Sequence, residues 1–314
     1  MAIAGRNRHE QAETSSKMDR GEAAQDRLGD APVGSEAGVR WLRRLGLKIE
    51  LDSVVITAGA LHALDIILAA LTKPGDLVFA DELIYPGLMS VARHRHLRLQ
   101  GIAMDDVGMD ADALRTACRQ RKTQFLYYVP TLHIPTSAVL TAERRCKLVE
   151  IAKEYDLLIT EDDVHRPLME EAPPPLANLA PGRCFFIAST SKVIAGGLRV
   201  AFVAAPGFAQ ELLKESIWAS MVMVAPLTVE LATLWIEGGT ADQTVESECC
   251  LECGLDHQRG QIASRWRGRA SGKGLYPRHH EDRAADLREP FSTRFYLVGH
   301  APATNRGPQP LRSF

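Results

Sequence analysis

Lys192 is the residue whose neighbours best suit it to chemistry. It follows Ser189-Thr190-Ser191, and Arg199 comes seven residues later. The apolar run 184–188 just before this segment indicates a buried strand. An amine at a strand end can form an imine with an aldehyde, while hydroxyls and a guanidinium can bind a phosphate. The alternative is that Lys192 is an ordinary solvated lysine in a loop. The rest of the chain decides between these two interpretations.

Three other segments lie where predicted strands end or helices begin. The turn 57–61 contains Gly59 and joins a strand to a helix, whose free backbone N–H groups suit a phosphate. Tyr85 follows a strand ending at Ala80, and its ring can stack on a flat cofactor. Asp163 closes an acidic triplet after the strand ending at Thr160, where a carboxylate can keep a pyridine nitrogen protonated. A turn tyrosine and a hydrated acidic loop are the alternatives.

The elements that must position these residues alternate between strands and helices. Apolar, β-branched or aromatic runs predict strands at 54–57, 77–80, 97–102, 125–129, 157–160, 184–188 and 200–204. Apolar residues at helical spacing predict helices near 61–71, 87–94 and 141–155, and Asp110 can cap another that runs through Arg121. This order predicts an α/β fold with a mostly parallel sheet, helices on both faces, and ligands at the C-terminal strand ends.

Both ends of the chain differ from this middle. Residues 1–37 are polar and are predicted to be disordered, and residues 38–246 form the predicted large domain. Residues 247–314 form an atypical tail, rich in arginine and glycine and without core-forming periodicity. Cys249, Cys250, Cys253 and His257 cluster there, but no second cysteine pair completes a zinc site, so no metal is expected.

Composition narrows the class of protein further. The 314 residues are 46% hydrophobic and 24% charged, as in ordinary globular proteins. The net charge of -2 gives no general attraction to nucleic acid or anionic membranes. No apolar run approaches the roughly 20 residues that span a bilayer, and the N-terminus lacks a signal-peptide core. A cytoplasmic protein with no membrane or direct nucleic-acid partner is expected.

Five motifs, in a fixed order, connect these signals. They lie at 56–64, 81–87, 129–136, 159–165 and 189–199. In them the chain resembles the class I/II, fold-type-I pyridoxal-phosphate aminotransferases. Within that family it looks most like the aminotransferase-like domain of MocR-type regulators of the GntR group and their stand-alone relatives. The resemblance covers roughly residues 38–246.

The resemblance implies pyridoxal 5'-phosphate as cofactor and a role for each matching residue. Lys192 would be the Schiff-base lysine, Asp163 the partner of the pyridine nitrogen, and Tyr85 the ring that stacks on the cofactor. The residues implied around the phosphate are Ala60, Leu61, Ser189, Ser191 and Arg199. The implied reaction transfers an amino group between an amino acid and a 2-oxo acid, in a homodimer.

Two residues depart from the family pattern near the cofactor's phenolic oxygen. Ile134 replaces an asparagine that donates a hydrogen bond to that oxygen, and neighbouring His133 is a partial substitute. His165 replaces the usual tyrosine and can still form a hydrogen bond there, with a pKa near neutrality. Both changes would alter the pKa of the imine rather than abolish cofactor binding.

The C-terminal part departs most, because no small domain that closes the active site is recognisable after residue 246. Its composition is closer to an out-of-frame or degraded reading of such a gene. The N-terminal zone is too short and polar for a winged-helix DNA-binding domain. Three functions therefore stay open: an aminotransferase, the ligand-sensing domain of a transcriptional regulator, or a truncated remnant of low activity.

Overall fold

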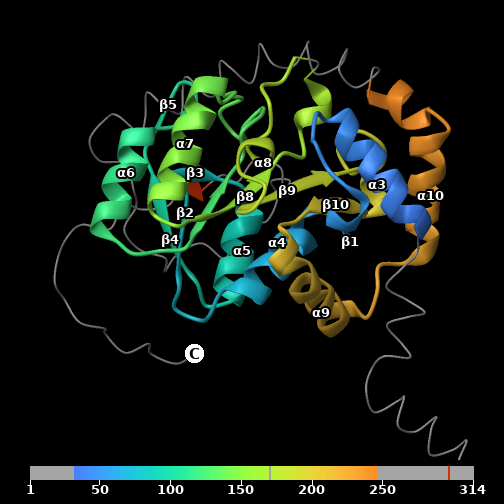
Figure 1. Cartoon of the computed structure of the whole chain (residues 1–314), viewed down its shortest axis with the longest axis horizontal. Helices are drawn as coiled ribbons and strands as arrows, with labels where there is room; N and C mark the ends of the chain where they lie inside the picture. The colour runs from blue at the N-terminus through green and yellow to red at the C-terminus, as the bar shows by residue number, and fades with distance from the viewer. Residues whose placement is uncertain (1–31, 170, 246–295, 298–314) are drawn as a thin grey trace, which may run out of the picture.

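A seven-stranded sheet forms the centre of the chain (Figure 1). The structure, a computed structural model, describes residues 32–169, 171–245 and 296–297. In sheet order the strands are β1 (Val54–Thr57), β10 (Ala201–Ala204), β9 (Cys184–Ser189), β8 (Leu158–Asp162), β7 (Phe125–Tyr128), β2 (Leu77–Asp81) and β4 (Arg98–Ile102). From β9 to β4 all neighbours are parallel, whereas β10 runs antiparallel to both β9 and β1. Every strand of this sheet except β10 therefore ends at the same edge.

Helices cover both faces of the sheet. One face packs against α4 (Ala60–Leu71), α5 (Pro86–His94) and α9 (Gln210–Met221), which gather at the bottom of Figure 1. The other face packs against α3 (Pro32–Arg44), α6 (Ala111–Gln120), α7 (Ala142–Glu154), α8 (Leu176–Leu179) and α10 (Pro226–Glu237). Strand side chains alternate between the two cores: Phe79 and Leu126 lie in one, Val78 and Phe125 in the other.

Shorter elements lie around this sheet. They are β3 (Leu83–Ile84), β5 (Met104–Asp105), β6 (Gly108–Met109), β11 (Tyr296–Leu297) and 3₁₀ helices at Leu51–Ser53, Arg166–Leu168, Gly196–Leu198 and Gly207–Ala209. β11 pairs antiparallel with β3, just before Tyr85. Within the described ranges, no helix combines the length and apolar character that a bilayer span requires.

The structure confirms the predicted fold class and two of its helix starts. Asp110 caps α6 by accepting a hydrogen bond from the Ala113 N–H at 2.7 Å, and Thr141 caps α7 through the Arg144 N–H at 3.2 Å. The expected boundary at residue 37 falls inside α3, which begins at Pro32 and buries Trp41 against the core. The other residues of the predicted N-terminal segment, and the predicted tail apart from β11, lie outside the described residues, and so does the cysteine cluster at 249–257.

Candidate active site

The predicted site residues gather at the edge where the parallel strands end. Asp162 is the last residue of β8, and Ser189 is the last residue of β9. Thr57, at the end of β1, and Ser189 both pair with Ala201, the first residue of antiparallel β10. The loops at these strand ends therefore meet, and one of them carries Lys192.

The turn before α4 is shaped to receive an anion. Gly59 adopts a φ of 91°, which an L-residue with a side chain rarely tolerates. A Cβ on Gly59 would lie 2.6 Å from Nη2 of Arg199, so the guanidinium sits directly against the bare backbone. Ala60 and Leu61 begin α4 and carry apolar side chains, so they offer an anion only their backbone N–H groups.

Two serines, Ser189 and Ser191, join Arg199 and the turn at Gly59. We call this set of residues the anion pocket. Arg199 donates from Nη1 to Oγ of Ser191 at 3.3 Å, and the Ser191 N–H donates to Oγ of Ser189 at 3.1 Å. The side chain of Arg199 is exposed, whereas Ser189 is buried at the strand end. A guanidinium, a hydroxyl and a helix N-terminus thus converge, which is a donor set suited to a phosphate.

Asp162 is a buried carboxylate within range of the charge of Lys192. The positive charge of Lys192 acts on Asp162 and lowers its pKa in part, while burial raises that pKa more strongly, to about 6. Tyr127 donates from Oη to Oδ2 of Asp162 at 2.8 Å. The other oxygen, Oδ1, is buried and has no hydrogen-bond partner in the described part of the chain. Near neutral pH this site offers an ionised oxygen that can accept one more hydrogen bond.

Tyr85 lies near the same carboxylate. Its ring packs against Gly87, where an added Cβ would lie 2.1 Å from Cε1 of the ring. The side chain remains 40% exposed. Burial raises the pKa of Tyr85, the charge of Asp162 raises it further, and Arg199 lowers it. Tyr85 therefore presents an open aromatic ring within range of the charges of Asp162 and Arg199.

Asp163, which the sequence assigned to the pyridine nitrogen, has a different environment. It forms an ion pair with Arg166, Oδ2 to Nη1, at 3.3 Å, and it is fully buried. Burial raises the pKa of Asp163, and Arg145, Arg166 and a hydrogen bond from Thr131 lower it in part. Its Oδ2 is thus engaged with a guanidinium, whereas its Oδ1, like that of Asp162, is buried without a hydrogen-bond partner in the described part of the chain.

The alternation of side chains along a strand explains why the neighbouring acids have different surroundings. β8 extends to Asp162, two residues beyond the predicted strand end at Thr160. Glu161 turns to the face of α7 and pairs with Arg145, Nη1 to Oε1, at 3.4 Å, whereas Asp162 turns to the face of Tyr127. The sequence alone did not point to Asp162 or Tyr127. Counting alternate positions from Leu158, through Thr160 to Asp162, is the signal that separates Asp162 from its two acidic neighbours.

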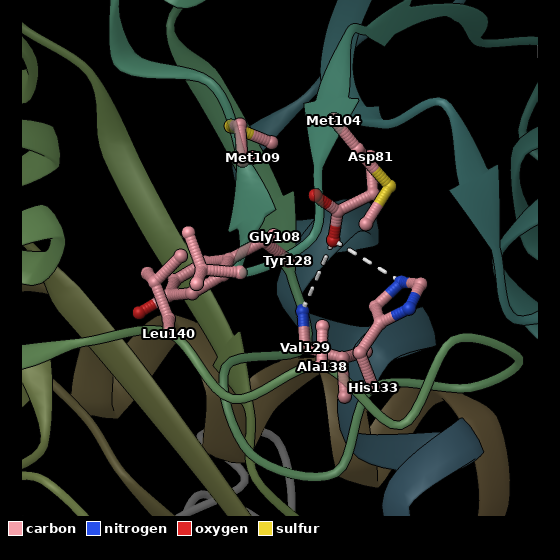
Figure 2. A pocket seen from close by; sticks show the side chains of 10 residues that line it. Asp81, Met104, Gly108, Met109, Tyr128, Val129, His133, Ala138 and Leu140 are labelled. Carbon is pink, nitrogen blue, oxygen red and sulfur yellow. Dashed lines mark hydrogen bonds and ion pairs between the residues drawn. The ribbon is translucent and has the colours of Figure 1, made fainter. Parts of the chain in front are cut away.

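His133 already contacts other protein groups, and Figure 2 shows its ring facing the carboxyl of Asp81. Its Nε2 lies 3.0 Å from the carbonyl oxygen of Leu83 and 3.5 Å from Oδ2 of Asp81, and its Nδ1 lies 2.9 Å from Oγ1 of Thr136. Burial lowers the pKa of His133 to about 4 and raises that of Asp81 to about 8, so near pH 7 both are neutral. Both ring nitrogens already have partners, so a cofactor contact would require breaking one of these contacts.

The other two residues predicted near the phenolic oxygen are Ile134 and His165, and their roles there stay predictions. Ile134 lies in the loop after β7 that also carries His133. His165 is buried and immediately precedes the 3₁₀ helix Arg166–Leu168. Its role at the cofactor remains a prediction.

Pyridoxal phosphate fits these residues on two independent observations. The buried Oδ1 of Asp162 needs a donor, which a protonated pyridine nitrogen provides. The close approach of Arg199 to Gly59 creates a cluster of donors that any side chain at residue 59 would disturb. Lys192, Asp162 and Arg199 are thus the residues that would hold the cofactor.

Comparisons with known proteins agree with this geometry. Residues 35–225 match the family described as aminotransferase class I and II. The chain is 32% identical over 221 residues to the uncharacterized HTH-type transcriptional regulator YdeF of Bacillus subtilis, covering 70% of this chain and 48% of the relative. The multiple substrate aminotransferase of Thermococcus profundus superposes with a TM-score of 0.65 at 25% identity, covering 69% of this chain and 56% of that one.

A third similar protein was solved with a cofactor derivative. It is the α-aminoadipate aminotransferase LysN of Thermus thermophilus, in complex with N-(5'-phosphopyridoxyl)-L-leucine. Its TM-score is 0.61 at 27% identity, and the match covers 67% of this chain and 56% of LysN.

The chain belongs to the class I and II aminotransferase family, whose profile matches well over half of its length. The proteins that are similar to it include both aminotransferases and HTH-type regulators. The chain spans about half the length of the curated relatives it matches.

Proposed function

We propose that this chain is a pyridoxal-phosphate-dependent aminotransferase that transfers an amino group between an amino acid and a 2-oxo acid. The observation that carries the proposal is the buried carboxylate of Asp162, whose Oδ2 accepts from Tyr127 and whose Oδ1 has no hydrogen-bond partner in the described residues. The anion pocket of Gly59, Ser191 and Arg199 supports it at the same sheet edge. Family membership supports the same class of reaction.

Each residue has a defined task in this proposal. Bound pyridoxal phosphate supplies an electron sink for the substrate carbon next to the amine. Lys192 holds the cofactor covalently and then, as a free amine, moves the proton of that carbon. Asp162 keeps the ring nitrogen protonated, Tyr85 covers one ring face, and Arg199 binds the phosphate. Asp162 takes the task that the sequence gave to Asp163.

Replacing Lys192 tests this proposal directly. The full chain with added pyridoxal phosphate should show the visible absorption band of covalently bound cofactor, and Lys192→Ala should lose it. Lys214, an exposed residue of α9 paired with Glu211, provides the matched control, and Lys214→Ala should keep the band. Borohydride reduction followed by peptide mapping should find the cofactor on Lys192. An unchanged spectrum in Lys192→Ala contradicts the assignment.

A ligand-sensing domain is the second candidate, because a relative 32% identical to this chain is named as an HTH-type transcriptional regulator. In that case the site binds cofactor and amino acid with very slow turnover. Mixing the loaded protein with an amino acid, then with a 2-oxo acid, separates the two functions. Formation of a new amino acid over many cycles supports the enzyme, and a spectral change without product supports the sensor.

The homodimer and the cytoplasmic location remain predictions. The exposed ring of Tyr85 supports the first, because a site this open gains from a neighbouring subunit that covers it. Sedimentation of the loaded protein would measure its oligomeric state.

A further inference from the structure

The hydroxyl of Tyr127 lies against the carboxylate that we assign to the cofactor ring. Tyr127 is 1% exposed, and its Oη donates to Oδ2 of Asp162 at 2.8 Å. In the parallel pair β7 and β8, Tyr127 pairs with Thr160, so Asp162 stands two residues further along on the same face. The register of two central strands thus fixes the hydroxyl beside one carboxylate oxygen.

The two oxygens of Asp162 therefore have different surroundings. Oδ2 accepts the hydrogen bond from Tyr127, whereas Oδ1 is buried without a hydrogen-bond partner in the described ranges. A carboxylate accepts through both oxygens, so the bond from Tyr127 orients the group and leaves one oxygen to accept from a ligand. The charge of Lys192 acts on this carboxylate, and the carboxylate acts in turn on Tyr85.

Burial opposes the ionised form of Asp162, and the tyrosine favours it. Burial is the largest cause that raises the pKa of Asp162, and the hydrogen bond from Tyr127 is the largest that lowers it. Tyr127 keeps its proton, because burial and the charge of Asp162 raise its own pKa well above the usual range. The other charged or titratable groups that act on this pair are Asp81, Asp163, Lys192 and Tyr85.

We propose that Tyr127 is a positioning residue: it holds Asp162 ionised and leaves Oδ1 to accept the proton of a pyridine nitrogen. This inference rests on the proposed function for the identity of the ring. The hydrogen bond itself can be tested in the cofactor-free protein.

Phenylalanine at 127 removes the hydroxyl and keeps the ring. Hydrogen bonds to charged groups are among the stronger ones in proteins, so Tyr127→Phe should favour protonation of Asp162 by about tenfold or more. Carbon-13 NMR of the cofactor-free full chain with labelled aspartate should record this as a rise in the titration midpoint of Asp162. Its signal is identified by its absence in Asp162→Asn.

The adjacent tyrosine provides a matched control. Tyr128 is equally buried, but it belongs to the other core, and its Oη has no hydrogen-bond partner in the described part of the chain. Tyr128→Phe should leave the midpoint of Asp162 unchanged. An equal shift in both variants would mean that general repacking, rather than the hydrogen bond, moves the titration, and this would overturn the proposal.

Cofactor binding provides the second readout. Tyr127→Phe should keep the covalent band of bound pyridoxal phosphate, weaken cofactor affinity about tenfold, and shift the pH dependence of that band. If the midpoint of Asp162 does not move while the wild type still binds cofactor covalently, the inference fails and the proposed function stands. If the wild type binds no cofactor covalently, the proposed function fails, and the proposed ring-binding role of Tyr127 fails with it.

A second substitution covers the case in which Tyr127→Phe does not fold. Introducing 3-fluorotyrosine at residue 127 keeps the shape and makes the hydroxyl a stronger donor. The midpoint of Asp162 should then fall instead of rise. No change, or a change in the same direction as with phenylalanine, would overturn the inference.

Discussion

Asp162 and Asp163 show how far the environments of adjacent residues can differ. Both are buried carboxylates at the end of β8. Asp163 is paired with Arg166, whereas Asp162 meets Tyr127 and the charge of Lys192. Both keep a buried Oδ1 without a hydrogen-bond partner in the described residues, so the proposed assignment of Asp162 to the cofactor ring rests on the difference in their other partners.

Replacing Asp162 and Asp163, one at a time, with asparagine should separate their roles. Asp163→Asn leaves the buried guanidinium of Arg166 without its charge partner, so the free energy of unfolding should fall by about 3 kcal/mol or more. Asp162→Asn should leave the cofactor-free fold at least as stable, because it removes a carboxylate whose ionised form burial disfavours. It should instead weaken cofactor binding. Urea unfolding and cofactor titration of both variants measure the two effects, and a reversed pattern would return the ring-nitrogen role to Asp163.

At the scale of elements, the turn between β1 and α4 is the part most tightly fitted to a ligand. Gly59 has a positive φ, and Arg199 packs against it. The side chain of His62 fixes the same turn, because its Nδ1 accepts from the Ala58 N–H at 3.1 Å and its Nε2 lies 3.0 Å from Oγ of Ser220 on α9. The turn is thus held in place by contacts from α4, α9 and the loop that carries Arg199.

Alanine at residue 59 should damage phosphate binding more than stability. Gly59→Ala strains the backbone by about 1 kcal/mol and displaces the guanidinium of Arg199, so cofactor affinity should fall about tenfold. Gly75 provides a control with the same strain, since its φ is 92° and an added Cβ would meet nothing within 4 Å. Gly75→Ala should lower stability by a similar amount and leave cofactor affinity unchanged. Equal affinity loss in both variants would contradict the role of the turn.

At the scale of the whole molecule, the described fold buries several carboxyl groups near one sheet edge. Burial raises the pKa of Asp81 to about 8, of Glu161 to about 7 and of Asp162 to about 6. The folded chain therefore binds protons that the unfolded chain releases. The stabilisation is complete below the pKa of the unfolded carboxyls and is lost as the pH rises through the raised values. His133, with its lowered pKa, acts in the opposite direction between about pH 4 and 6.5.

Among the groups just named, only the three carboxyls still contribute to the pH dependence of stability above pH 6.5. The free energy of unfolding of the cofactor-free chain should fall between pH 6.5 and 8, and Asp81 should account for up to about 1.4 kcal/mol per pH unit. Asp81→Asn can still accept the long contact from the Val129 N–H, 3.5 Å in the native chain, and it should flatten this slope. Urea unfolding at several pH values measures the slopes. Identical slopes for the variant and the native chain would mean that Asp81 is not the group that binds this proton.

The amino-acid sequence by itself determined the class of fold and predicted most of the residues of the candidate site. Alternating strand and helix patterns specify the parallel sheet, because hydrophobic periodicity decides which faces are buried. The segments around Gly59, Tyr85, Lys192 and Arg199 sit at strand ends that a parallel sheet must bring to one edge. These conclusions depend on local pattern and topology, which the sequence contains.

Only the tertiary structure shows that Asp162 meets Tyr127 whereas Asp163 meets Arg166. It also shows that the ring of His133 already has partners. The choice between Asp162 and Asp163 depends on how far β8 extends, since one residue reverses the direction of the side chain. His133 is engaged because the chain brings the carbonyl of Leu83 and the carboxyl of Asp81, some fifty positions away, to its ring. Such contacts arise from packing between segments far apart in sequence, which a local pattern does not specify.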